Sequence, residues 1–380
     1  MHPPPLPAPD PEALAAARRL LERIGAELAA GGNWISFARY MELALYEPEL
    51  GYYAGGAAKL GAPGDFVTAP EMGGLFARTL ARQVAELLQP GDAILEFGAG
   101  SGALAATLVD ELAALGAGGH EYLILEPSAE LAGRQRTRLG KRARWPGALP
   151  QDFRGVMLAN EVLDAMPVHA LAWTGAGVLE RGVCAREGRL AWSERPAQGE
   201  VLAAARAIAL ELPPSGRYES ELGLAARAWM RTLGAHLERG ALLAIDYGFP
   251  RREYYHPQRS MGTLQCHYRH RSHGDVFYYP GLQDITAHID FSALAEAALE
   301  SGLELLGYAP QAQFLLNCGL TELLSAADPE DTARYAPLAA EAQRLVSPAE
   351  MGELFKVLAV GRGVRAGLRG FARGDRRHAL

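Results

Sequence analysis

The ten residues AILEFGAGSG, at positions 93–102, constrain the fold of this chain more than any other segment. An apolar run leads into three alternating glycines, Gly98, Gly100 and Gly102, and a helix-like segment follows at 103–115. Glycines in such a turn let a ligand approach the backbone closely, because no Cβ stands between them. The first N–H groups of the helix are unpaired and lie at its positive dipole end, so they attract a negative group. The segment therefore predicts a nucleotide-like ligand.

Further segments continue the alternation of strands and helices. This pattern predicts a parallel sheet with helices on both faces, whereas 170–193 breaks the rhythm and predicts a small antiparallel meander. A helix is expected at 12–30, and a long polar and aromatic loop at 249–290. The other expected strands are 122–125, a weak one at 143–145, 156–159, 241–245, 303–308 and 355–360, and the other expected helices are 71–88, 129–139, 199–212, 222–239 and 291–301.

The charge and cysteine content exclude several classes of protein. A net charge of −7 argues against a non-specific binder of nucleic acid or of a membrane surface. Three widely spaced cysteines without C-x-x-C spacing fit a reducing compartment, and no apolar run approaches the roughly 20 residues that span a bilayer. The proline-rich N-terminus has neither a secretory nor a transit-peptide layout, so we expect a cytoplasmic protein. The arginine-rich segment 363–380 is interpreted as a solvated, frayed tail, with a partner or RNA contact as the alternative.

Two acids separate the possible ligands. Glu96 lies two residues before Gly98, where an anion suits a sulfonium group such as that of S-adenosylmethionine better than a pyrophosphate. Glu126 ends the next strand, where a carboxylate can accept both ribose hydroxyls. The alternatives are that backbone N–H groups satisfy Glu96 and that Glu126 stabilises a helix N-terminus. The predicted donor site comprises Glu96, Gly98, Gly100, Ser101, Gly102 and Glu126.

The same glycine loop also satisfies the G-x-G-x-x-[G/A] pattern of an NAD-dependent oxidoreductase. Glu96 argues against that class, as does the spacing of 28 residues from Gly98 to Glu126. The dinucleotide fingerprint places its ribose acid about 20 residues on.

Two specific motifs, GDFVTAPE at 64–71 and NEVLDAMPVH at 160–169, lie on either side of the glycine loop. Together with the loop they resemble the MidA family, whose mitochondrial members are protein arginine methyltransferases that assist assembly of respiratory complex I. Further matches are ALYEPELGYYAGG at 44–56, LLAIDYG at 242–248, and GTLQCHYRH with PGLQDITAHIDF at 262–291.

The resemblance implies an α/β, Rossmann-like class I methyltransferase with a seven-stranded sheet whose last strand is antiparallel. It also implies S-adenosylmethionine as methyl donor and a protein arginine as acceptor. An assembly chaperone that retains the donor site is the alternative from another class, and the oligomeric state stays open, with a homodimer as one candidate. The expected regions are an N-terminal helical region over the donor site at 1–90, a methyltransferase domain at 91–362 with an insertion at 168–240 and an acceptor loop at 249–290, and the basic tail.

An arginine acceptor needs carboxylates beside it, because guanidinium and sulfonium are both positive. Glu161 and Asp164 follow the fourth strand, and our hypothesis is that Glu161 binds the guanidinium while Asp164 assists it or holds it in place. The alternative is that both stabilise their own loop.

Two further segments have open roles. Asp65 and Thr68 lie in a loop that could fold over the donor, or that could simply pack and precede a helix beginning near Pro70. Cys266, together with the histidines of 267–273, lacks the second paired half of a zinc site, so we expect no metal there.

Overall fold

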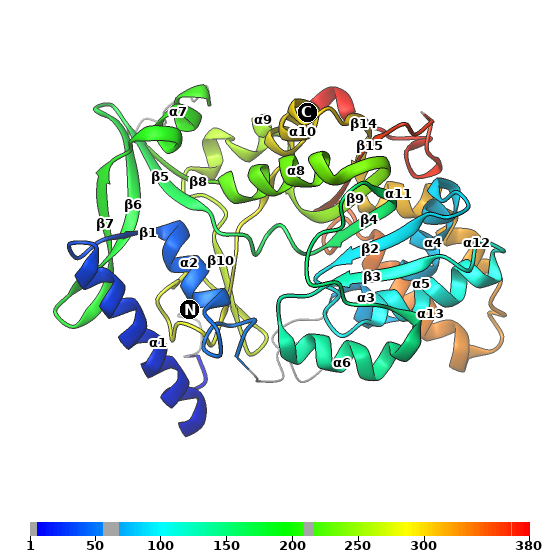
Figure 1. Ribbon diagram of the computed structural model, residues 1–380, viewed down its shortest axis with the longest axis horizontal. Helices are drawn as coiled ribbons and strands as arrows, with labels where there is room; N and C mark the ends of the chain where they lie inside the picture. Colours follow the sequence, from blue (N-terminus) through cyan, green and yellow to red (C-terminus); the bar gives the residue numbers. More distant parts are fainter. Residues whose placement is uncertain (1–5, 56–67, 209–215, 366) are drawn as a thin grey trace. The chain divides into compact units, whose positions relative to one another are not determined.

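A computed structural model describes residues 6–55, 68–208, 216–365 and 367–380 (Figure 1). The chain forms two compact units. The sheet unit comprises Val67–Leu163, Ala228–Pro250 and Ile289–Leu380, and the meander unit comprises Met1–Phe66, Asp164–Arg227 and Arg251–His288.

The sheet unit contains a seven-stranded sheet with the strand order β14-β15-β9-β4-β2-β3, and the short β13 pairs with β9 (Figure 1). β2, β3, β4 and β9 run parallel, whereas β15 is antiparallel to both of its neighbours. This confirms the expected class of sheet with an antiparallel last strand. The strands are β2 (Ala93–Phe97), β3 (Glu121–Leu125), β4 (Phe153–Asn160), β9 (Leu237–Phe249), β13 (Ile289–Asp290), β14 (Glu304–Pro310) and β15 (Phe355–Arg362).

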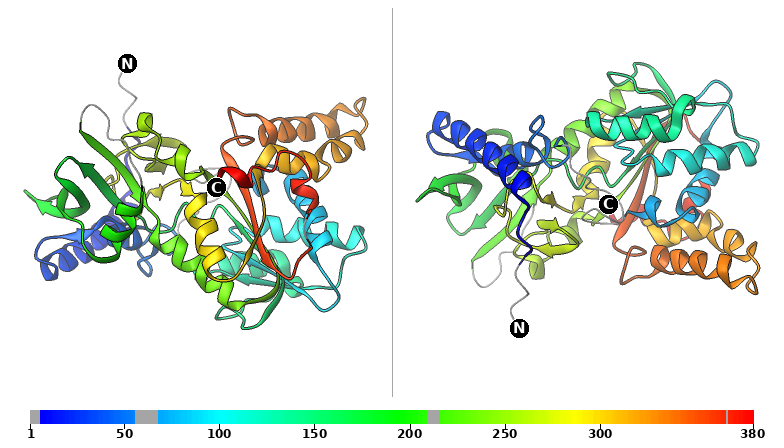
Figure 2. Two further views of the ribbon diagram at one scale, coloured as in Figure 1. Left: turned by 90° about the horizontal axis from the view of Figure 1, so that it is seen from above. Right: turned by 90° about the horizontal axis from the view of Figure 1, so that it is seen from below.

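Apolar side chains from alternate strand positions build the core on one face of this sheet. Ile94, Val156 and Ala241 are in register across three strands, and all three are buried in a cluster with α4 and α5. Figure 2 (left) shows the yellow α10 and the orange α11–α13 on opposite sides of β15. The helices are α4 (Leu75–Leu87), α5 (Ala103–Ala114), α6 (Ala129–Leu139), α8 (Leu224–His236), α10 (Phe291–Glu300), α11 (Gln311–Asn317), α12 (Leu320–Ser325) and α13 (Thr332–Val346). Among the described residues, none of the helices has the length and apolar character to cross a bilayer.

The helix expected at 71–88 is broken in two. α3 (Ala69–Met72) ends at Gly73, and α4 begins at Leu75. The carboxylate of Glu341 on α13 accepts hydrogen bonds from the N–H groups of Leu75, at 2.8 Å, and Phe76, at 3.3 Å. The break therefore exposes the first N–H groups of α4 to a carboxylate that is distant in sequence, which satisfies them.

The weak strand expected at 143–145 is only a single bridge. Arg144 pairs in parallel with Leu123 of β3, and the following residues leave the sheet. The short η1 turn (Gly140–Arg142) comes just before this bridge. Pro146 and Gly147 follow closely, and neither favours continuation of a strand.

The prediction of a solvated C-terminal tail is wrong. Leu368 and Phe371 are buried, and the side-chain amide of Asn317 donates to the carbonyls of Gly370, at 2.9 Å, and Arg373, at 2.8 Å. The segment forms two short turns, η3 (Arg369–Phe371) and η4 (Arg377–Ala379). Its apolar residues thus pack on the sheet unit, while most of its arginines lie at the surface.

The meander unit contains the predicted antiparallel insertion as a five-stranded sheet with the order β1-β6-β5-β8, in which β7 pairs with β6. The predicted loop at 249–290 also contains a three-stranded sheet with the order β11-β10-β12. The elements are β1 (Ile35–Ser36), β5 (His169–Thr174), β6 (Gly177–Arg186), β7 (Arg189–Pro196), α7 (Gly199–Ala207), β8 (Arg217–Leu222), α9 (Arg251–Tyr254), η2 (Pro257–Arg259), β10 (Gln265–Tyr268), β11 (Arg271–His273) and β12 (Asp284–Thr286).

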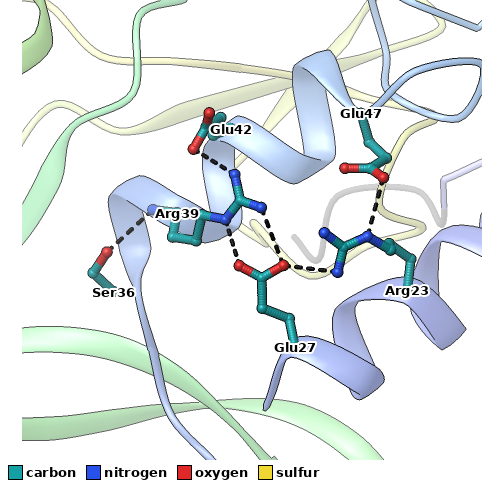
Figure 3. Close-up of polar contacts among 6 residues, drawn as sticks. All are labelled: Arg23, Glu27, Ser36, Arg39, Glu42 and Glu47. Carbon is teal, nitrogen blue, oxygen red and sulfur yellow. Dashed lines mark hydrogen bonds and ion pairs between the residues drawn. The ribbon is translucent and has the colours of Figure 1, made fainter. Parts of the chain in front are cut away.

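Two N-terminal helices, α1 (Pro11–Ala30) and α2 (Phe37–Tyr46), pack in the same unit and are joined by ion pairs (Figure 3). The Glu27 carboxylate lies between Arg23, at 2.7 Å, and Arg39, whose Nη2 donates at 3.1 Å. The hydrogen bond from Arg39 is the largest cause that lowers the pKa of Glu27. These contacts link half-buried polar side chains of two helices whose apolar sides are buried.

Candidate functional site

The carboxyl ends of the central parallel strands align at one edge of the sheet. Phe97 of β2 is in register with Leu125 of β3 and Ala159 of β4, and Asn160 is in register with Ile245 of β9. The residues that follow these positions therefore emerge at the same edge. They include the glycine loop and the acids Glu126, Glu161 and Asp246.

The glycine loop is the turn between β2 and α5, as the sequence predicted. Gly98, Gly100 and Gly102 have φ values of 58°, 53° and 79°, which residues with a Cβ rarely adopt. The N–H of Gly98 donates to the Leu125 carbonyl at 3.0 Å and so fixes the loop to β3. Gly102 is the N-cap of α5, and no side chain caps this helix. The first turn of α5 therefore follows a glycine N-cap and has no capping side chain.

Glu96 is buried beneath this loop. Its side chain is only 3% exposed, and its carboxylate accepts a hydrogen bond from the Tyr122 hydroxyl at 2.7 Å. Burial raises the pKa of Glu96 to about 7, although the bond from Tyr122 opposes the shift. The partner is a tyrosine hydroxyl rather than the backbone N–H groups that the alternative interpretation expected. The proposed contact of Glu96 with a sulfonium stays a prediction.

Glu126 is fixed at the end of β3 by two donors. The N–H of Ser128 donates to one carboxylate oxygen at 3.0 Å, and the side-chain amide of Gln135 donates to the other at 2.8 Å. Burial raises the pKa of Glu126, and these two hydrogen bonds oppose the shift. Sequence reasoning identified Glu126 but missed Gln135. A polar residue on the buried side of α6, where Ala132 and Leu139 are its apolar neighbours, was the available signal.

Ser101 is placed among side chains rather than at an open edge. Its hydroxyl hydrogen-bonds to Glu71 of α3 and accepts a hydrogen bond from Arg138 of α6 at 2.7 Å. Thr68 is the N-cap of α3, and its side chain makes no capping hydrogen bond. Asp65 lies outside the described residues. The structure thus places Thr68 at the start of the segment that contacts Ser101.

Glu161 has an unusual backbone conformation at the end of β4. Its φ is 53°, and its N–H donates to the Ile245 carbonyl at 2.9 Å. The fully buried carboxylate of Asp246 then accepts hydrogen bonds from the next two N–H groups, those of Val162 at 3.1 Å and Leu163 at 2.8 Å. Asp246 therefore stabilises the turn that contains Glu161.

The structure assigns Asp164 to the meander unit and Glu161 to the sheet unit. Asp164 is 7% exposed, and its carbonyl accepts a hydrogen bond from the N–H of Ala287 at 2.9 Å. The suggested assistance of Asp164 to Glu161 stays a prediction.

The histidine-rich segment forms the strands β10 and β11 in the meander unit. Cys266 is fully buried and in register with His273, and burial raises the pKa of its thiol. Within the described ranges, no group of three or more His, Cys, Asp and Glu side chains is arranged to bind a metal ion. Cys266 belongs to a core cluster together with Tyr40 and Val276.

A parallel α/β sheet with an antiparallel last strand and a glycine loop after a central strand defines a class I methyltransferase fold. The chain belongs to the family described as "Putative S-adenosyl-L-methionine-dependent methyltransferase", whose model matches residues 75–309. S-adenosylmethionine is therefore the methyl donor, and the nicotinamide alternative is wrong.

Similar proteins cover nearly the whole chain. "Protein arginine methyltransferase NDUFAF7, mitochondrial" of Danio rerio is 29% identical, over 90% of this chain and 87% of its own length. Its Drosophila melanogaster homologue is 27% identical, over 95% of this chain and 90% of its own length. A crystal structure of a "likely methyl transferase" from Burkholderia thailandensis, bound to S-adenosyl-homocysteine, is 50% identical over 99% of this chain and 100% of that chain, with a TM-score of 0.93.

The described residues fit an adenosyl donor. Three of the five residues at 98–102 are glycines, which have no Cβ, and this allows close approach of a ligand to the backbone at those positions. The carboxylate of Glu126 is fixed on both oxygens by protein donors and still has lone pairs for hydroxyl groups.

Proposed function

We propose that this protein methylates an arginine side chain of a partner protein. The support from relatives is that curated proteins named protein arginine methyltransferases match it over about nine tenths of its length. The observation that carries the proposal is the acidic turn at the carboxyl end of β4, where Glu161 is held in a conformation that is rare for glutamate.

The electrostatics of the reaction call for acids at this edge of the sheet. The donor supplies a methyl group on a positively charged sulfur, and a guanidinium stays protonated at neutral pH. Two cations repel each other when they approach in a site of low dielectric. Glu126 and Glu161 emerge at the same sheet edge and supply the charge that offsets this repulsion. A carboxylate can also orient a guanidinium by accepting two parallel hydrogen bonds.

The conformation of Glu161 supports a specific role for its side chain. A left-handed backbone at a residue with a Cβ costs about 1–2 kcal/mol. Asp246 offsets that cost through hydrogen bonds to the following N–H groups. Strained residues that are stabilised by their surroundings cluster at functional sites. We assign Glu161 to the guanidinium and Asp164 to an assisting role.

In the donor half of the site, we assign the ribose hydroxyls to Glu126 and the close backbone contacts to Gly98, Gly100 and Gly102. Ser101 orients the loop through Glu71 and Arg138, with which it hydrogen-bonds. We further propose that Asp65 and Thr68 contribute to donor binding. Alignment of a nucleophile with the bond that breaks can supply about 7–11 kcal/mol of the barrier.

The test is Glu161→Gln in a host strain that otherwise lacks this protein. The substitution keeps the shape of the side chain but removes the charge, so methylarginine should disappear from the target peptides in mass spectrometry of the proteome. Affinity for S-adenosylhomocysteine, measured by calorimetry on the purified protein, should stay unchanged. Glu187→Gln is the matched control, since Glu187 also has a positive φ, of 51°, but lies in the exposed β6–β7 turn.

Three outcomes are decisive. Loss of methylarginine in Glu161→Gln but not in Glu187→Gln supports the proposal. Wild-type methylation in Glu161→Gln overturns the role of that carboxylate. A third result would be that deletion of the protein removes no methylarginine although the purified protein binds S-adenosylhomocysteine. That result would overturn the proposal of arginine methylation and favour an assembly factor.

A further inference from the structure

Gln135 lies at the meeting point of three segments of the donor half. It belongs to α6 and its side chain is completely buried. Its amide nitrogen donates to the Gly100 carbonyl at 2.9 Å and to the Glu126 carboxylate at 2.8 Å. Its amide oxygen accepts from the indole N–H of Trp145 at 2.9 Å. We propose that Gln135 is a positioning residue that sets the donor affinity of this protein.

The chemistry of the three partners fixes the orientation of this amide. An indole N–H can only donate, whereas a peptide carbonyl and a carboxylate can only accept. The amide oxygen must therefore face Trp145, and both amide hydrogens are used by Gly100 and Glu126. A flipped amide would lose all three bonds, so the group has one stable arrangement.

The two donated bonds act on two different parts of the donor half. One bond, with the N–H of Ser128 on the other oxygen, immobilises the Glu126 carboxylate. The other holds the carbonyl of Gly100, and in a planar trans peptide the N–H of Ser101 points the opposite way. Gln135 thus couples the direction of a loop N–H to the position of the acid assigned to the ribose.

Trp145 is the anchor of this arrangement. Its ring lies beneath the guanidinium of Arg136, with 5.2 Å from the guanidinium carbon to the ring centroid. Trp145 follows the single β-bridge at Arg144, so the indole is fixed close to the sheet. The loop that contains Trp145 follows α6 and η1 in the chain, and it supplies the indole N–H that donates to Gln135.

Isothermal titration with S-adenosylhomocysteine tests this inference, which rests on the donor half of the proposed function and not on the identity of the acceptor. Gln135→Met keeps the length of the side chain but removes all three bonds, and we expect affinity to fall about tenfold or more, since hydrogen bonds to charged groups are the strong ones. Gln83→Leu is the matched control. Gln83 is another fully buried glutamine of the sheet unit, and it contacts Glu86 and the Gly370 N–H instead of the glycine loop.

A double-mutant cycle separates positioning from general loss of structure. If Gln135 acts largely through Glu126, Gln135→Met should have much less effect on affinity in a Glu126→Gln background than in the wild type. Equal losses in both backgrounds would overturn the inference, as would an affinity of Gln135→Met within twofold of the wild type, or an equal loss in Gln83→Leu.

If Gln135→Met does not fold, Trp145→Phe decides the question. That variant keeps an aromatic ring but removes the one N–H that orients the amide, so affinity should fall about two- to fivefold. Unchanged affinity would overturn the inference. Failure of the wild type to bind S-adenosylhomocysteine would instead overturn the donor half of the proposed function.

Discussion

Replacing Glu96 by glutamine should stabilise the protein at alkaline pH and change its stability little in acid. The glutamate is buried beneath the glycine loop, and burial raises its pKa to about 7 from 4.5. A glutamine has nearly the same shape and can still accept the hydrogen bond from the Tyr122 hydroxyl. The substitution therefore removes the cost of ionising a buried carboxyl while it keeps the contact.

The magnitude follows from the linkage between protonation and folding. Below pH 4.5 the carboxyl is protonated in both states, and its contribution to stability is fully present. As the pH rises, the unfolded chain loses the proton first, so the free energy of unfolding falls until the folded group also ionises near pH 7. At about 1.4 kcal/mol for each pH unit, the whole effect is about 3 kcal/mol. Between about pH 5 and pH 8.5 the advantage of Glu96→Gln should grow by about 2–3 kcal/mol.

Urea unfolding of both proteins at the two pH values measures this difference. Titrating groups that do not interact with Glu96 contribute equally in both proteins and cancel in the comparison, whereas Glu126 and Tyr122 interact with Glu96. A difference in unfolding free energy that is the same at both pH values would refute the reasoning. An advantage that is larger in acid would show that the ionised form is the stabilised one, which is the opposite sign.

Three further substitutions test other contacts. Oδ2 of Asp246 accepts from the N–H groups of Val162 and Leu163, and Oδ1 accepts from the N–H of Tyr247, so Asp246→Asn replaces one of these acceptors by a donor. The unfolding free energy should fall by about 2–4 kcal/mol, and a loss below about 0.5 kcal/mol in urea unfolding would contradict this. Phe371→Ala should lower the free energy of unfolding by about 3 kcal/mol and increase trypsin cleavage of the C-terminal segment. If the segment were solvated, the substitution would have neither effect. Glu27→Gln removes the charge between Arg23 and Arg39 and should lower the unfolding free energy by about 1 kcal/mol at neutral pH. The loss should be smaller below pH 4, because the pKa of Glu27 is lowered in the folded protein and its stabilising charge disappears as the carboxylate is protonated. Equal losses at neutral pH and below pH 4 would count against the ion pairs.

The central sheet could be predicted from sequence because its signals are local. The run at 93–97 and the glycines at 98, 100 and 102 are adjacent in the chain, and glycine permits the positive φ values that this turn requires. The positions of the acids at strand ends follow from the same alternation. Parallel strands bring their carboxyl ends to one edge whatever the details of packing.

The long-range hydrogen bonds that fix the acids and the helix ends could not be predicted in this way. Tyr122 donates to Glu96 across 26 positions of the chain, and Glu341 accepts from Leu75 across 266. The second contact decides that the helix expected at 71–88 is broken. Neither is visible as periodicity, because each depends on which strand or helix becomes a spatial neighbour.

The C-terminal segment shows how composition can mislead. The five arginines at 363–380 suggested a solvated tail, but the two apolar residues Leu368 and Phe371 determine its packing. Long arginine side chains can lie at the surface while the backbone between them is packed. Gln135 was missed for the converse reason, because glutamine by residue type favours the surface, although its spacing from Ala132 and Leu139 places it on the buried side of α6.

The chain passes five times from one compact unit to the other, and this ordering has a consequence for biosynthesis. The meander unit needs residues as far as His288, and the central sheet lacks β15 until Arg362 has been translated. Neither unit can complete its fold until late in translation, so the nascent chain exposes unpaired strand edges during most of its elongation. Such intermediates are prone to aggregation, and expression yield should therefore depend strongly on growth temperature and on co-produced chaperones.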